Sequence, residues 1–532
     1  MKFYKIFVET SWKSIVPVHI VEISVSIHDY HANKDDLNDF LSSKLKGKYP
    51  KINAMITLKK STDARKRAIK HNLRLEVYTE GDYPVKQKKP EYKLIDKSKF
   101  VHIIGFGPAG IFAALKCLEL GIKPIVIERG KSVKNRRRDV AQLNRSGIIN
   151  TESNYCYGEG GAGTFSDGKL YTRSHKRGKI QEILDLFVVH GADPNILYEA
   201  HPHIGTNKLP QIIQNLRETI IEKGGEIRFE QKLEDIQHAD GQIHEIKVNG
   251  IWEKCNQLIL ATGHSARDIY CLLDNRDVAI EAKPFAMGFR IEHPQSLINT
   301  IQYHTPENVK ILPPASYSLV CQIKQKGVFS FCMCPGGVIA PAATENEEVV
   351  VNGWSPSKRN GKFANSGWVT EIGPEEWKEF AHLGSLAGLE FQKSIERKAY
   401  QMGGGNFKVP AQNIQDFLSN KMSDDLNESS YYPGMTSVDL NELYPPEVTY
   451  RLREGLREMT KRLKGFNHKD GIVTAPESRT SSPVRIPRTK LLSHPDLVNL
   501  YPCGEGAGYA GGIISAALDG FRVANSIGEQ LS

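Results

Sequence analysis

The sequence lacks any uninterrupted apolar run of the roughly 18 to 20 residues that a membrane-spanning helix needs. It also lacks internal repeats and low-complexity tracts. Hydrophobic residues make up 40% of its 532 positions and charged residues 25%, which is the composition of a folded globular protein. Intrinsically disordered, collagen-like and coiled-coil proteins are therefore excluded, and the length predicts two or three domains.

Cysteine is scarce, with eight residues in the chain, and no Cys-x-x-Cys or Cys/His ligand pattern occurs. We therefore expect reduced thiols and no metal site. The N-terminus begins like a signal peptide, basic and then apolar, but Glu9 and Lys13 interrupt the apolar stretch and no small-residue cleavage site follows. We expect a cytoplasmic protein with no membrane span.

The excess positive charge lies in the N-terminal part of the chain. Residues 1–100 contain 21 Lys and Arg against 12 Asp and Glu, whereas the remaining residues contain 49 of each class. A basic segment can bind nucleic acid, but this one lacks the interleaved aromatic side chains on which bases stack. Nucleic acid is therefore the least favoured partner of this segment, although the charge leaves that alternative open.

The first 98 residues predict a ferredoxin-like α+β module followed by a linker. β-branched and aromatic residues predict strands at 3–10, 18–26, 52–58 and 73–78. Apolar spacing predicts a helix at 34–45, and a basic segment predicts a second helix at 61–67. Residues 79–98 are rich in lysine and contain two prolines, which is typical of a linker.

A glycine-rich turn follows a continuous apolar strand at residues 100–104. The turn reads Gly105-Phe106-Gly107-Pro108-Ala109-Gly110, and it opens a helix at 111–120 before a second apolar strand that ends in Glu128. Gly105 permits a tight turn, Gly107 lets the backbone approach a pyrophosphate, and Gly110 permits close helix packing. This β-α-β unit predicts a dinucleotide site, and a carboxylate at Glu128 favours ribose hydroxyls and argues against NADP.

Two later segments indicate that the dinucleotide is FAD. Ala261-Thr262-Gly263 follows a strand at 257–260, and Gly504-Glu505-Gly506 ends another strand before a helix at 513–526. In FAD folds related to glutathione reductase and hydroxybenzoate hydroxylase, the last element returns to the first β-α-β unit. Glu505 would then meet the ribityl chain, and the helix N-terminus would face the flavin pyrimidine edge.

The loop at residues 158–169 lies where these folds pass a chain segment along the flavin ring. Its side chains Ser166, Asp167 and Lys169 offer polar contacts, although an ordered loop without chemical roles is the alternative. The basic run at 134–138 is suited to neutralising a pyrophosphate, or is simply solvated. The residues expected to contact FAD are Gly105, Gly107, Pro108, Ala109, Gly110, Glu128, Arg129, Arg137, Gly161, Gly163, Thr164, Thr262, Gly263, Gly504, Glu505, Gly511, Gly512 and Ile513.

Cys332 and Cys334 are the only close pair of cysteines. A Cys-x-Cys pair can form a strained disulfide that exchanges electrons with a flavin. Flavin disulfide reductases use a longer spacing just after the first β-α-β unit, so we expect two buried thiols without a redox role. Polar groups around Arg290 and in the segment 478–482 are suited to a substrate pocket. The catalytic candidates are Ser166, Asp167, Lys169, Arg290 and Arg479.

These motifs occur in an order that resembles one protein family. The segments are the turn at 105–110, the loop at 158–169, FAMGFRIEHP at 285–294, FCMCPGG at 331–337, RTSSP at 479–483 and YPCGEGAGYAGG at 501–512. Together they are similar to the largely uncharacterised bacterial FAD-dependent dehydrogenases, also called NAD(P)/FAD-dependent oxidoreductases. The resemblance implies FAD as cofactor and leaves the substrate unnamed.

We therefore predict an α/β protein with a Rossmann-like FAD-binding domain of the glutathione-reductase/hydroxybenzoate-hydroxylase type. The predicted parts are a basic module and linker at 1–98, the FAD-binding domain at 99–275 and 465–532, and an inserted α+β substrate domain at 276–464. The predicted function is hydride transfer between flavin N5 and an organic substrate, with NAD(P)H as a candidate transient donor at the same flavin. The alternatives are a flavin monooxygenase and a non-catalytic FAD-binding redox sensor or nucleic-acid-binding protein. The sequence does not identify the oligomeric state.

Overall fold

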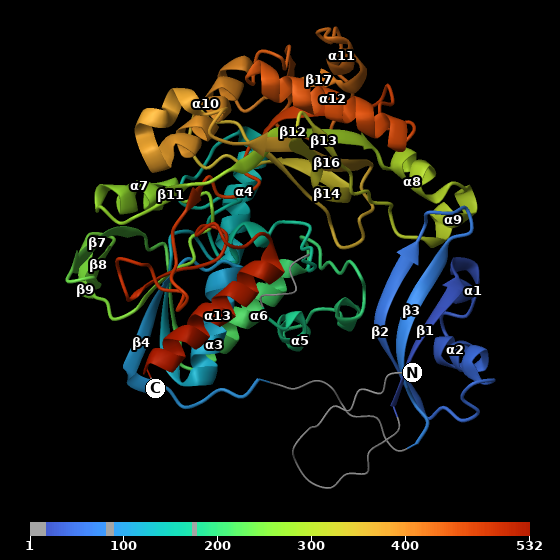
Figure 1. Cartoon of the computed structure of the whole chain (residues 1–532), viewed down its shortest axis with the longest axis horizontal. Helices are drawn as coiled ribbons and strands as arrows, with labels where there is room; N and C mark the ends of the chain where they lie inside the picture. Colours follow the sequence, from blue (N-terminus) through green and yellow to red (C-terminus); the bar gives the residue numbers. More distant parts are fainter. Residues whose placement is uncertain (1–17, 81–89, 173–177, 532) are drawn as a thin grey trace. The chain divides into compact units, whose positions relative to one another are not determined.

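The computed structural model describes residues 18–80, 90–172 and 178–531. The chain divides into two compact units (Figure 1). The smaller unit contains the N-terminal residues up to Lys88 together with the short segment Leu197–Ala200, and the larger unit contains the rest.

The smaller unit contains a three-stranded antiparallel sheet in the order β1-β3-β2. Its strands are β1 Val18–Ser26, β2 Ala54–Asp63 and β3 Lys70–Tyr78, and the helices α1 Ile27–Ala32 and α2 Leu37–Leu45 connect β1 to β2. β1 and β2 both run antiparallel to the central β3, so they are parallel to each other. This split β-α-β unit is half of the predicted ferredoxin-like fold.

The helix predicted at residues 61–67 is wrong, because this segment ends β2 and begins a hairpin. Asp63 pairs with Lys70 of β3, and its carboxylate accepts hydrogen bonds from the backbone and guanidinium of Arg65. An Asp side chain that bonds to the backbone two residues later stabilises a turn in place of a helix. The strand predicted at 3–10 and much of the predicted linker lie outside the described residues.

The larger unit contains the predicted parallel sheet. Its five strands follow the order β21 Leu500–Pro502, β10 Leu258–Leu260, β4 Asp96–Ile104, β5 Ile122–Glu128 and β6 Glu226–Phe229. Helix α3 Pro108–Leu120 follows β4 and packs against the last helix, α13 Ile513–Leu531. The contact needs Gly520, because a Cβ there would lie 2.2 Å from the Ala109 carbonyl oxygen. The C-terminal segment thus returns to the first β-α-β unit, which confirms the predicted Rossmann-like fold.

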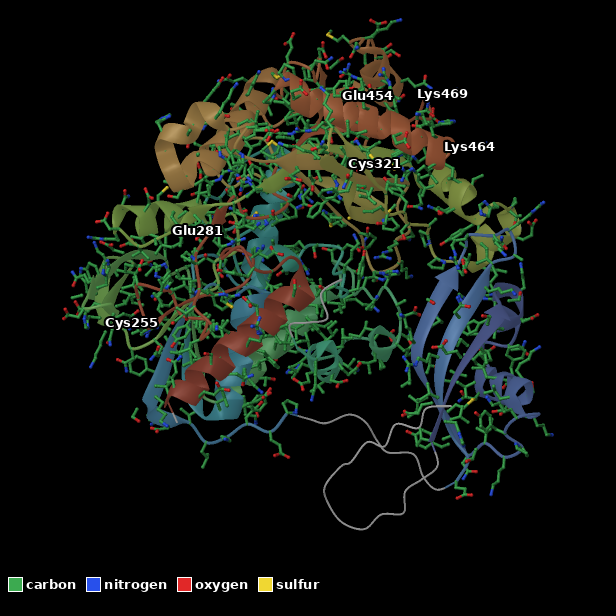
Figure 2. All side chains as sticks on the ribbon, viewed as in Figure 1. Cys255, Glu281, Cys321, Glu454, Lys464 and Lys469 are labelled. Atoms are coloured by element: carbon green, nitrogen blue, oxygen red, sulfur yellow. The ribbon has the colours of Figure 1, made fainter. Side chains whose placement is uncertain are left out.

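A second, largely antiparallel sheet of eight strands forms the other layer of this unit. Its strands are β13 Val320–Ile323, β14 Lys326–Pro341, β16 Phe363–Ile372, β12 Phe285–Pro294, β19 Ile472–Glu477, β17 Val409–Asn413 and β18 Met435–Ser437, with β15 Val351–Trp354 paired to β14. Helices α10 Ala387–Met402 and α12 Pro446–Arg462 pack on it. The thiol of Cys321 on β13 lies 3.9 Å from the Gly455 carbonyl oxygen of α12 (Figure 2). Strand β19 lies beyond the boundary predicted at residue 464, yet it pairs between β12 and β17.

The remaining elements lie between these strands along the chain. They are α4 Val133–Ser146, α5 Ile180–Val189, α6 Leu209–Glu222, α7 Arg267–Asn275, α8 Gln295–Tyr303, α9 Pro306–Ile311, α11 Ile414–Ser419, the 3-10 helices Gly161–Gly163, Pro194–Leu197 and Lys378–Leu386, a small sheet of β7 Leu233–Ala239, β8 Gln242–Val248 and β9 Ile251–Lys254, and the pair β11 Glu281–Ala282 and β20 Val484–Arg485. No helix within the described ranges is long and apolar enough to cross a membrane.

Candidate functional site

One cavity of about 820 Å³ lies at the carboxyl ends of the parallel strands, in the larger unit. Ile104, Glu128 and Ala261, at or just after the ends of β4, β5 and β10, line it, and so do Phe329 to Met333 of β14 in the antiparallel sheet. Open α/β sheets bind ligands at this end of their strands. The volume is in the range of about 300 to 1,000 Å³ that is typical of small-molecule and cofactor sites.

The first glycine-rich turn forms one wall of the cavity through its backbone. Gly105 has a φ of +98°, and a Cβ there would lie 2.5 Å from the Ala261 carbonyl oxygen of the next strand end. Gly107 precedes α3 and lines the cavity, and a Cβ there would lie 3.7 Å from the Gly161 Cα, at ordinary van der Waals distance. The turn therefore presents the N-terminal amides of α3 to the cavity without a side chain in between.

Glu128, next to this wall, holds three loops together through hydrogen bonds to their backbone amides. Its carboxylate accepts hydrogen bonds from the backbone amides of Phe106 at 2.8 Å, Gly130 at 2.8 Å and Gly158 at 2.9 Å. The side chain is 4% exposed and lines the cavity. Since a carboxylate has about four acceptor positions, about one remains for a ligand. The predicted ribose contact thus competes with a structural role that the sequence pattern did not indicate.

Buried Arg136 of α4 supports the loop at 158–169. Its guanidinium donates hydrogen bonds to the carbonyl oxygens of Asn154, Tyr155 and Glu159, each at 2.8 Å. Arg137, the predicted pyrophosphate contact, is exposed and does not line the cavity. The basic run is therefore a helix in which one arginine orders the loop and its neighbours face solvent.

The C-terminal motif forms a second backbone wall. Gly511 and Gly512 line the cavity immediately before α13, and a Cβ on either would meet no atom within 4 Å. The Glu505 carboxylate accepts a hydrogen bond from the Gly512 amide and lies 3.7 Å from Nε2 of His264. The N-terminus of a 19-residue helix thus faces the cavity, where its dipole favours negative charge.

His264 follows the middle motif, and sequence analysis missed it. Its Nδ1 is buried without a hydrogen-bond partner among the described residues, and its ring lines the cavity. Burial lowers the pKa of this imidazole, although Glu505 partly offsets the effect. A neutral ring with a free nitrogen is able to accept or donate one hydrogen bond to a ligand. Its position directly after Ala-Thr-Gly is the only sequence signal for it.

Lys169 and Asp167 form an ionic cluster at the other end of the cavity. The Asp167 carboxylate pairs with Arg359 at 2.6 Å and with Lys169 at 3.5 Å. Burial opposes ionisation of Asp167, but the two cations outweigh it and lower the pKa of this carboxyl. Ser166 also lines the cavity, and its hydroxyl donates to the Gly163 carbonyl oxygen and accepts from the Gly168 amide.

Cys332 and Cys334 lie next to this cluster on β14. We expected two buried thiols, and Cys334 is buried, but Cys332 is only partly buried and lines the cavity. Nζ of Lys169 lies 3.8 Å from the Cys332 sulfur and 4.0 Å from the Cys334 sulfur. The strand pattern did not reveal this difference, because a β-bulge interrupts the regular alternation here.

Arg290 does not line the cavity but lies behind the two thiols. It is fully buried, pairs with Glu477 through two hydrogen bonds, and donates to the Cys332 carbonyl oxygen at 2.8 Å. Its neighbours in the FAMGFRIEHP segment, Glu292 and His293, are also buried. This segment therefore supports the wall of the cavity and does not supply direct ligand contacts.

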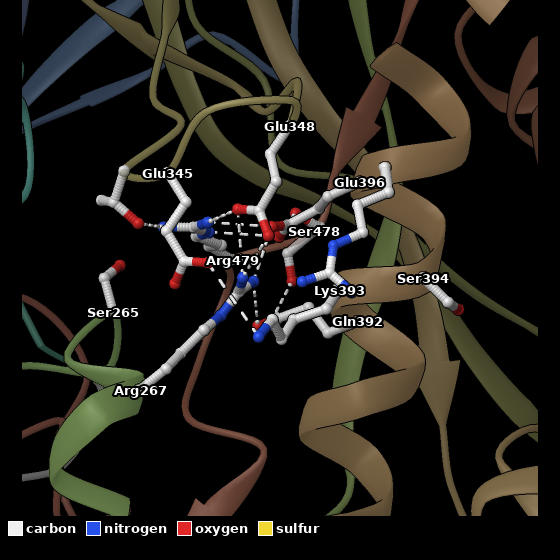
Figure 3. Close-up of polar contacts among 12 residues, drawn as sticks. Ser265, Arg267, Glu345, Glu348, Gln392, Lys393, Ser394, Glu396, Ser478 and Arg479 are labelled. Atoms are coloured by element: carbon white, nitrogen blue, oxygen red, sulfur yellow. Dashed lines mark hydrogen bonds and ion pairs between the residues drawn. The ribbon is translucent and has the colours of Figure 1, made fainter. Parts of the chain in front are cut away.

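Arg479 lines the cavity, but its guanidinium belongs to a buried ionic network (Figure 3). It contacts Glu396 at 2.8 Å and Glu348 at 3.0 Å, while Arg267 of α7 contacts the same two carboxylates at 2.5 and 2.9 Å. A further hydrogen bond reaches Thr344. With these donors occupied, Arg479 is better suited to holding the wall than to reacting with a substrate.

The two carboxylates of this network differ in acidity. Burial and the adjacent Glu396 raise the pKa of Glu348 to about 7, although two arginines oppose the shift. Burial also disfavours ionisation of Glu396, but Arg267 and Arg479 outweigh it and lower its pKa to about 2. As the pH falls, Glu348 is therefore the first of the pair to take up a proton.

The structure brings most of the predicted site residues together at the cavity. Those that line it are Gly105, Gly107, Pro108, Ala109, Glu128, Arg129, Gly161, Gly163, Ser166, Asp167, Lys169, Thr262, Gly263, Arg479, Glu505, Gly511, Gly512 and Ile513. Those that do not are Gly110, Arg137, Thr164, Arg290 and Gly504. Thr164 and Gly504 instead hold loops through hydrogen bonds to the Glu159 carbonyl and the Asp519 carboxylate. Among the described residues no cluster of His, Cys, Asp and Glu is suited to a metal ion.

Comparisons with known proteins agree with this geometry. Residues 284–480 match the family described as "FAD-dependent protein, C-terminal domain-like", and residues 17–78 match a domain of unknown function. The chain is 46% identical over 432 residues to an uncharacterized protein of Clostridium beijerinckii (strain ATCC 51743 / NCIMB 8052), and the match covers 80% of each chain. The chain belongs to this family of FAD-dependent proteins. FAD is therefore the cofactor.

Solved structures similar to this FAD-dependent protein are distant in sequence. CtdE in complex with FAD is 11% identical, with 82% of this chain and 84% of that chain covered and a TM-score of 0.29. A geranylgeranyl bacteriochlorophyll reductase-like protein from Thermoplasma acidophilum is 12% identical, with 81% and 79% covered and a TM-score of 0.33.

The cavity fits FAD by the chemistry of its walls. Two helix N-termini and the side-chain-free positions at Gly107 and Gly511 leave space for phosphates and a ring to contact backbone amides. The buried Nδ1 of His264, which has no partner among the described residues, marks a polar contact that a ligand would complete.

Proposed function

We propose that this FAD-dependent protein is an oxidoreductase in which a hydride passes between flavin N5 and an organic substrate. The observation that carries the proposal is that nucleotide-binding turns and side chains of the antiparallel sheet line one cavity. A substrate held against β14 would therefore meet the flavin in the same enclosed space. FAD supplies hydride transfer when bound, and the chain supplies orientation and electrostatics.

The two backbone walls would hold the cofactor. In this proposal the amides at Gly107 to Ala109 bind the pyrophosphate, the remaining acceptor position of Glu128 meets the adenosine ribose, and the N-terminus of α13 faces the pyrimidine edge. Because the helix dipole favours negative charge, α13 would stabilise the reduced, anionic flavin. His264, with its free nitrogen, would hydrogen bond at the same end.

The opposite end of the cavity would position the substrate. Lys169 carries a positive charge there, since Cys332, Cys334 and Asp167 raise the pKa of its ammonium against the effect of burial. An anionic or carbonyl-bearing substrate would suit this charge. Within the described ranges there is one parallel sheet of the β-α-β type, so a nicotinamide donor would use this same cavity before the substrate.

The test is anaerobic reduction and reoxidation of the purified holoprotein. We expect a yellow protein whose extracted flavin is FAD and not FMN. NADH and NADPH are added separately under anaerobic conditions, and the reduced protein is then mixed with quinones, α,β-unsaturated acids and disulfides. Rapid reoxidation by one class identifies the acceptor, whereas NAD(P)H-dependent oxygen uptake coupled to substrate hydroxylation would favour the monooxygenase alternative. A colourless protein that gains no flavin on reconstitution would contradict the proposal.

A further inference from the structure

Strand β14 carries two cysteines at the point where its pairing is irregular. Between Phe331 and Cys334 the strand advances three residues while its partner β16 advances two, which is a β-bulge. Cys332, within the bulge, has a φ of +44°, which lies in the left-handed region. Bulges next to active sites redirect side chains, and a strained backbone at a residue other than glycine often marks a functional position. Here the bulge directs Cys332 to the cavity.

The two thiols are close enough to share partners. The Cys334 thiol donates a hydrogen bond to the Cys332 carbonyl oxygen at 3.2 Å. The ammonium of Lys169 donates to the Met333 carbonyl between them and lies within 4.0 Å of both sulfurs. Cys334 is fully buried, whereas Cys332 lines the cavity. The pair therefore has one accessible sulfur and one sheltered sulfur.

Two cations stabilise a thiolate at this position. Lys169 approaches from the loop at 158–169, and Arg290 lies 3.4 Å from the Cys334 sulfur on the buried side. The Cys334 hydrogen bond, Lys169 and Arg290 together lower the pKa of Cys332 well below its usual value, although burial and Asp167 oppose the shift. The pKa of Cys334 is raised by its bond to Cys332 and by burial. Cys332 is therefore the member of the pair that more readily forms a thiolate, and Cys334 the member that more readily keeps its proton.

We propose that Cys332 and Cys334 are a redox-active pair that exchanges two electrons with the flavin bound in the same cavity. In the oxidising direction, the Cys332 thiolate and the Cys334 thiol form one S–S bond. The two electrons and the proton released by Cys334 pass to oxidised FAD, which becomes the singly protonated, anionic reduced form. The reverse reaction opens the disulfide. This inference rests on the proposed position of FAD in the cavity.

Neither alternative for the pair accounts for all of these contacts. Thiols that only fill space need no cation, yet Lys169 lies within 4.0 Å of both sulfurs and Arg290 lies 3.4 Å from the Cys334 sulfur. A metal site would need further ligands, and the described residues contain no such cluster around the pair. Cys156 provides an internal comparison, because it also lines the cavity and its sulfur hydrogen bonds to the Ser265 hydroxyl and the Ala342 carbonyl oxygen.

The first experiment counts electrons in the air-oxidised holoprotein. Anaerobic titration with dithionite should consume two electrons per flavin for FAD and two more for the disulfide. Cys334→Ser and Cys332→Ser should each consume only the two electrons per flavin that reduce FAD. The matched control Cys156→Ser should consume four, like the wild type. A wild-type protein that binds FAD but takes up only two electrons per flavin would overturn the inference and leave the proposed function intact.

The second experiment does not depend on flavin or on the variants. The oxidised wild-type protein is denatured in the presence of an alkylating reagent and digested. The mass of the peptide that contains both cysteines is then measured by mass spectrometry. We expect this peptide to lack two hydrogens and to be unalkylated, and to be doubly alkylated after reduction. Full alkylation of both residues in the oxidised protein would overturn the inference, even if the variants fail to fold or lose FAD.

Discussion

The two ends of the cavity are built in different ways. The nucleotide end consists of backbone amides from two helix N-termini, with glycines wherever a side chain would intrude. The β14 end consists of side chains that carry charge, namely Lys169, Asp167 and the Cys332–Cys334 pair. Under the proposed function, backbone geometry would hold the cofactor, whereas side-chain chemistry at the β14 end would select what reacts with it. Substitutions at the two ends should therefore fail in different ways.

The largest effect is expected at the backbone end, from Gly105→Ala. The new Cβ would lie 2.5 Å from the Ala261 carbonyl oxygen, at a φ of +98° that only glycine adopts easily. Strain and overlap together should cost more than about 3 kcal/mol. We expect insoluble or flavin-free protein, measured as FAD per mole after purification.

Gly511→Ala is the matched control at the same end. A Cβ there meets no atom of the chain within 4 Å, so the protein should fold with an unchanged melting temperature in its flavin-free form. Weaker FAD binding in this variant would show that the cofactor occupies that space. Unchanged FAD affinity would contradict the proposed placement of FAD against α13.

The next largest effect is expected from Glu128→Ala. This change removes the acceptor for three backbone amides, and each hydrogen bond to a charged group contributes about 1.5 to 3 kcal/mol. Both FAD retention and the unfolding free energy of the flavin-free protein should fall by at least about 3 kcal/mol. Glu128→Gln keeps one acceptor oxygen, so its FAD retention and its unfolding free energy should lie between those of the wild type and those of Glu128→Ala. Loss of FAD affinity without loss of stability would mean that the carboxylate serves the ligand alone.

At the side-chain end, Lys169→Met should leave FAD bound. Removing a cation 3.8 Å from the Cys332 sulfur should raise the pKa of this thiol. The measurement is the pH dependence of the alkylation rate of Cys332, followed by peptide mass. Lys169→Arg keeps the charge and should retain most of the low pKa. An identical pH profile in Lys169→Met would mean that Cys334 and Arg290 alone stabilise the Cys332 thiolate.

A smaller effect is expected from Glu348→Gln in the network of Figure 3. Because folding raises the pKa of Glu348 from 4.5 to about 7, folding favours its protonated form. The stability from this group is complete below about pH 4.5 and declines as the pH rises through about 7. The wild type should therefore lose about 1 to 3 kcal/mol of unfolding free energy across that range that the glutamine variant does not lose.

Measurement by urea unfolding should stay above about pH 5, because the lowered pKa of Glu396 acts in the opposite direction at more acidic pH. Glu347→Gln is the control, since this carboxylate lies next to Glu348 on the same loop but is exposed. If the unfolding free energies of the wild type and Glu348→Gln change with pH in the same way, the raised pKa of Glu348 would be contradicted.

The smallest effect is expected from removing the N-terminal module. A chain that begins at Pro90 keeps the hydrogen bonds of Lys93 to the Leu118 carbonyl and of Asp96 to the Gly121 carbonyl. It should fold and bind one FAD per chain like the full-length protein. The segment Leu197–Ala200 loses its pairing with Lys60 and should show faster amide exchange there. Flavin-free or insoluble protein would show that the module is integral to the FAD-binding fold.

The nucleotide end was predictable because its requirements are local. Gly105, Gly107 and Gly110 act through turn geometry, and the apolar strands of a parallel sheet have a pattern that needs no knowledge of distant residues. Local pattern failed where Asp63 bonds to Arg65 and replaces the predicted helix with a hairpin. It also could not separate Arg136, which is buried, from exposed Arg137, since both belong to one basic run.

The β14 end was not predictable because its contacts join distant segments. Lys169 meets Cys332 across more than 160 positions, and Arg267 meets Glu348 and Glu396 from another helix. A single bulge decides that Cys332 faces the cavity, and no composition signal precedes it. Likewise, the acceptor role of Glu128 toward Gly158 depends on how two loops pack and not on either loop alone.

The buried network of two arginines and two glutamates joins the two layers of the larger unit. Arg267 belongs to α7 beside the parallel sheet, while Glu396 and Arg479 belong to α10 and to the end of β19 in the antiparallel layer. Swinging the two layers apart would leave unpaired charges in the interior, at about 3 to 5 kcal/mol for each broken pair. The network therefore opposes a hinge motion between the layers. Under the proposed function, we expect the turnover of large substrates to respond to substitutions in the loops that line the cavity more than to substitutions between the layers.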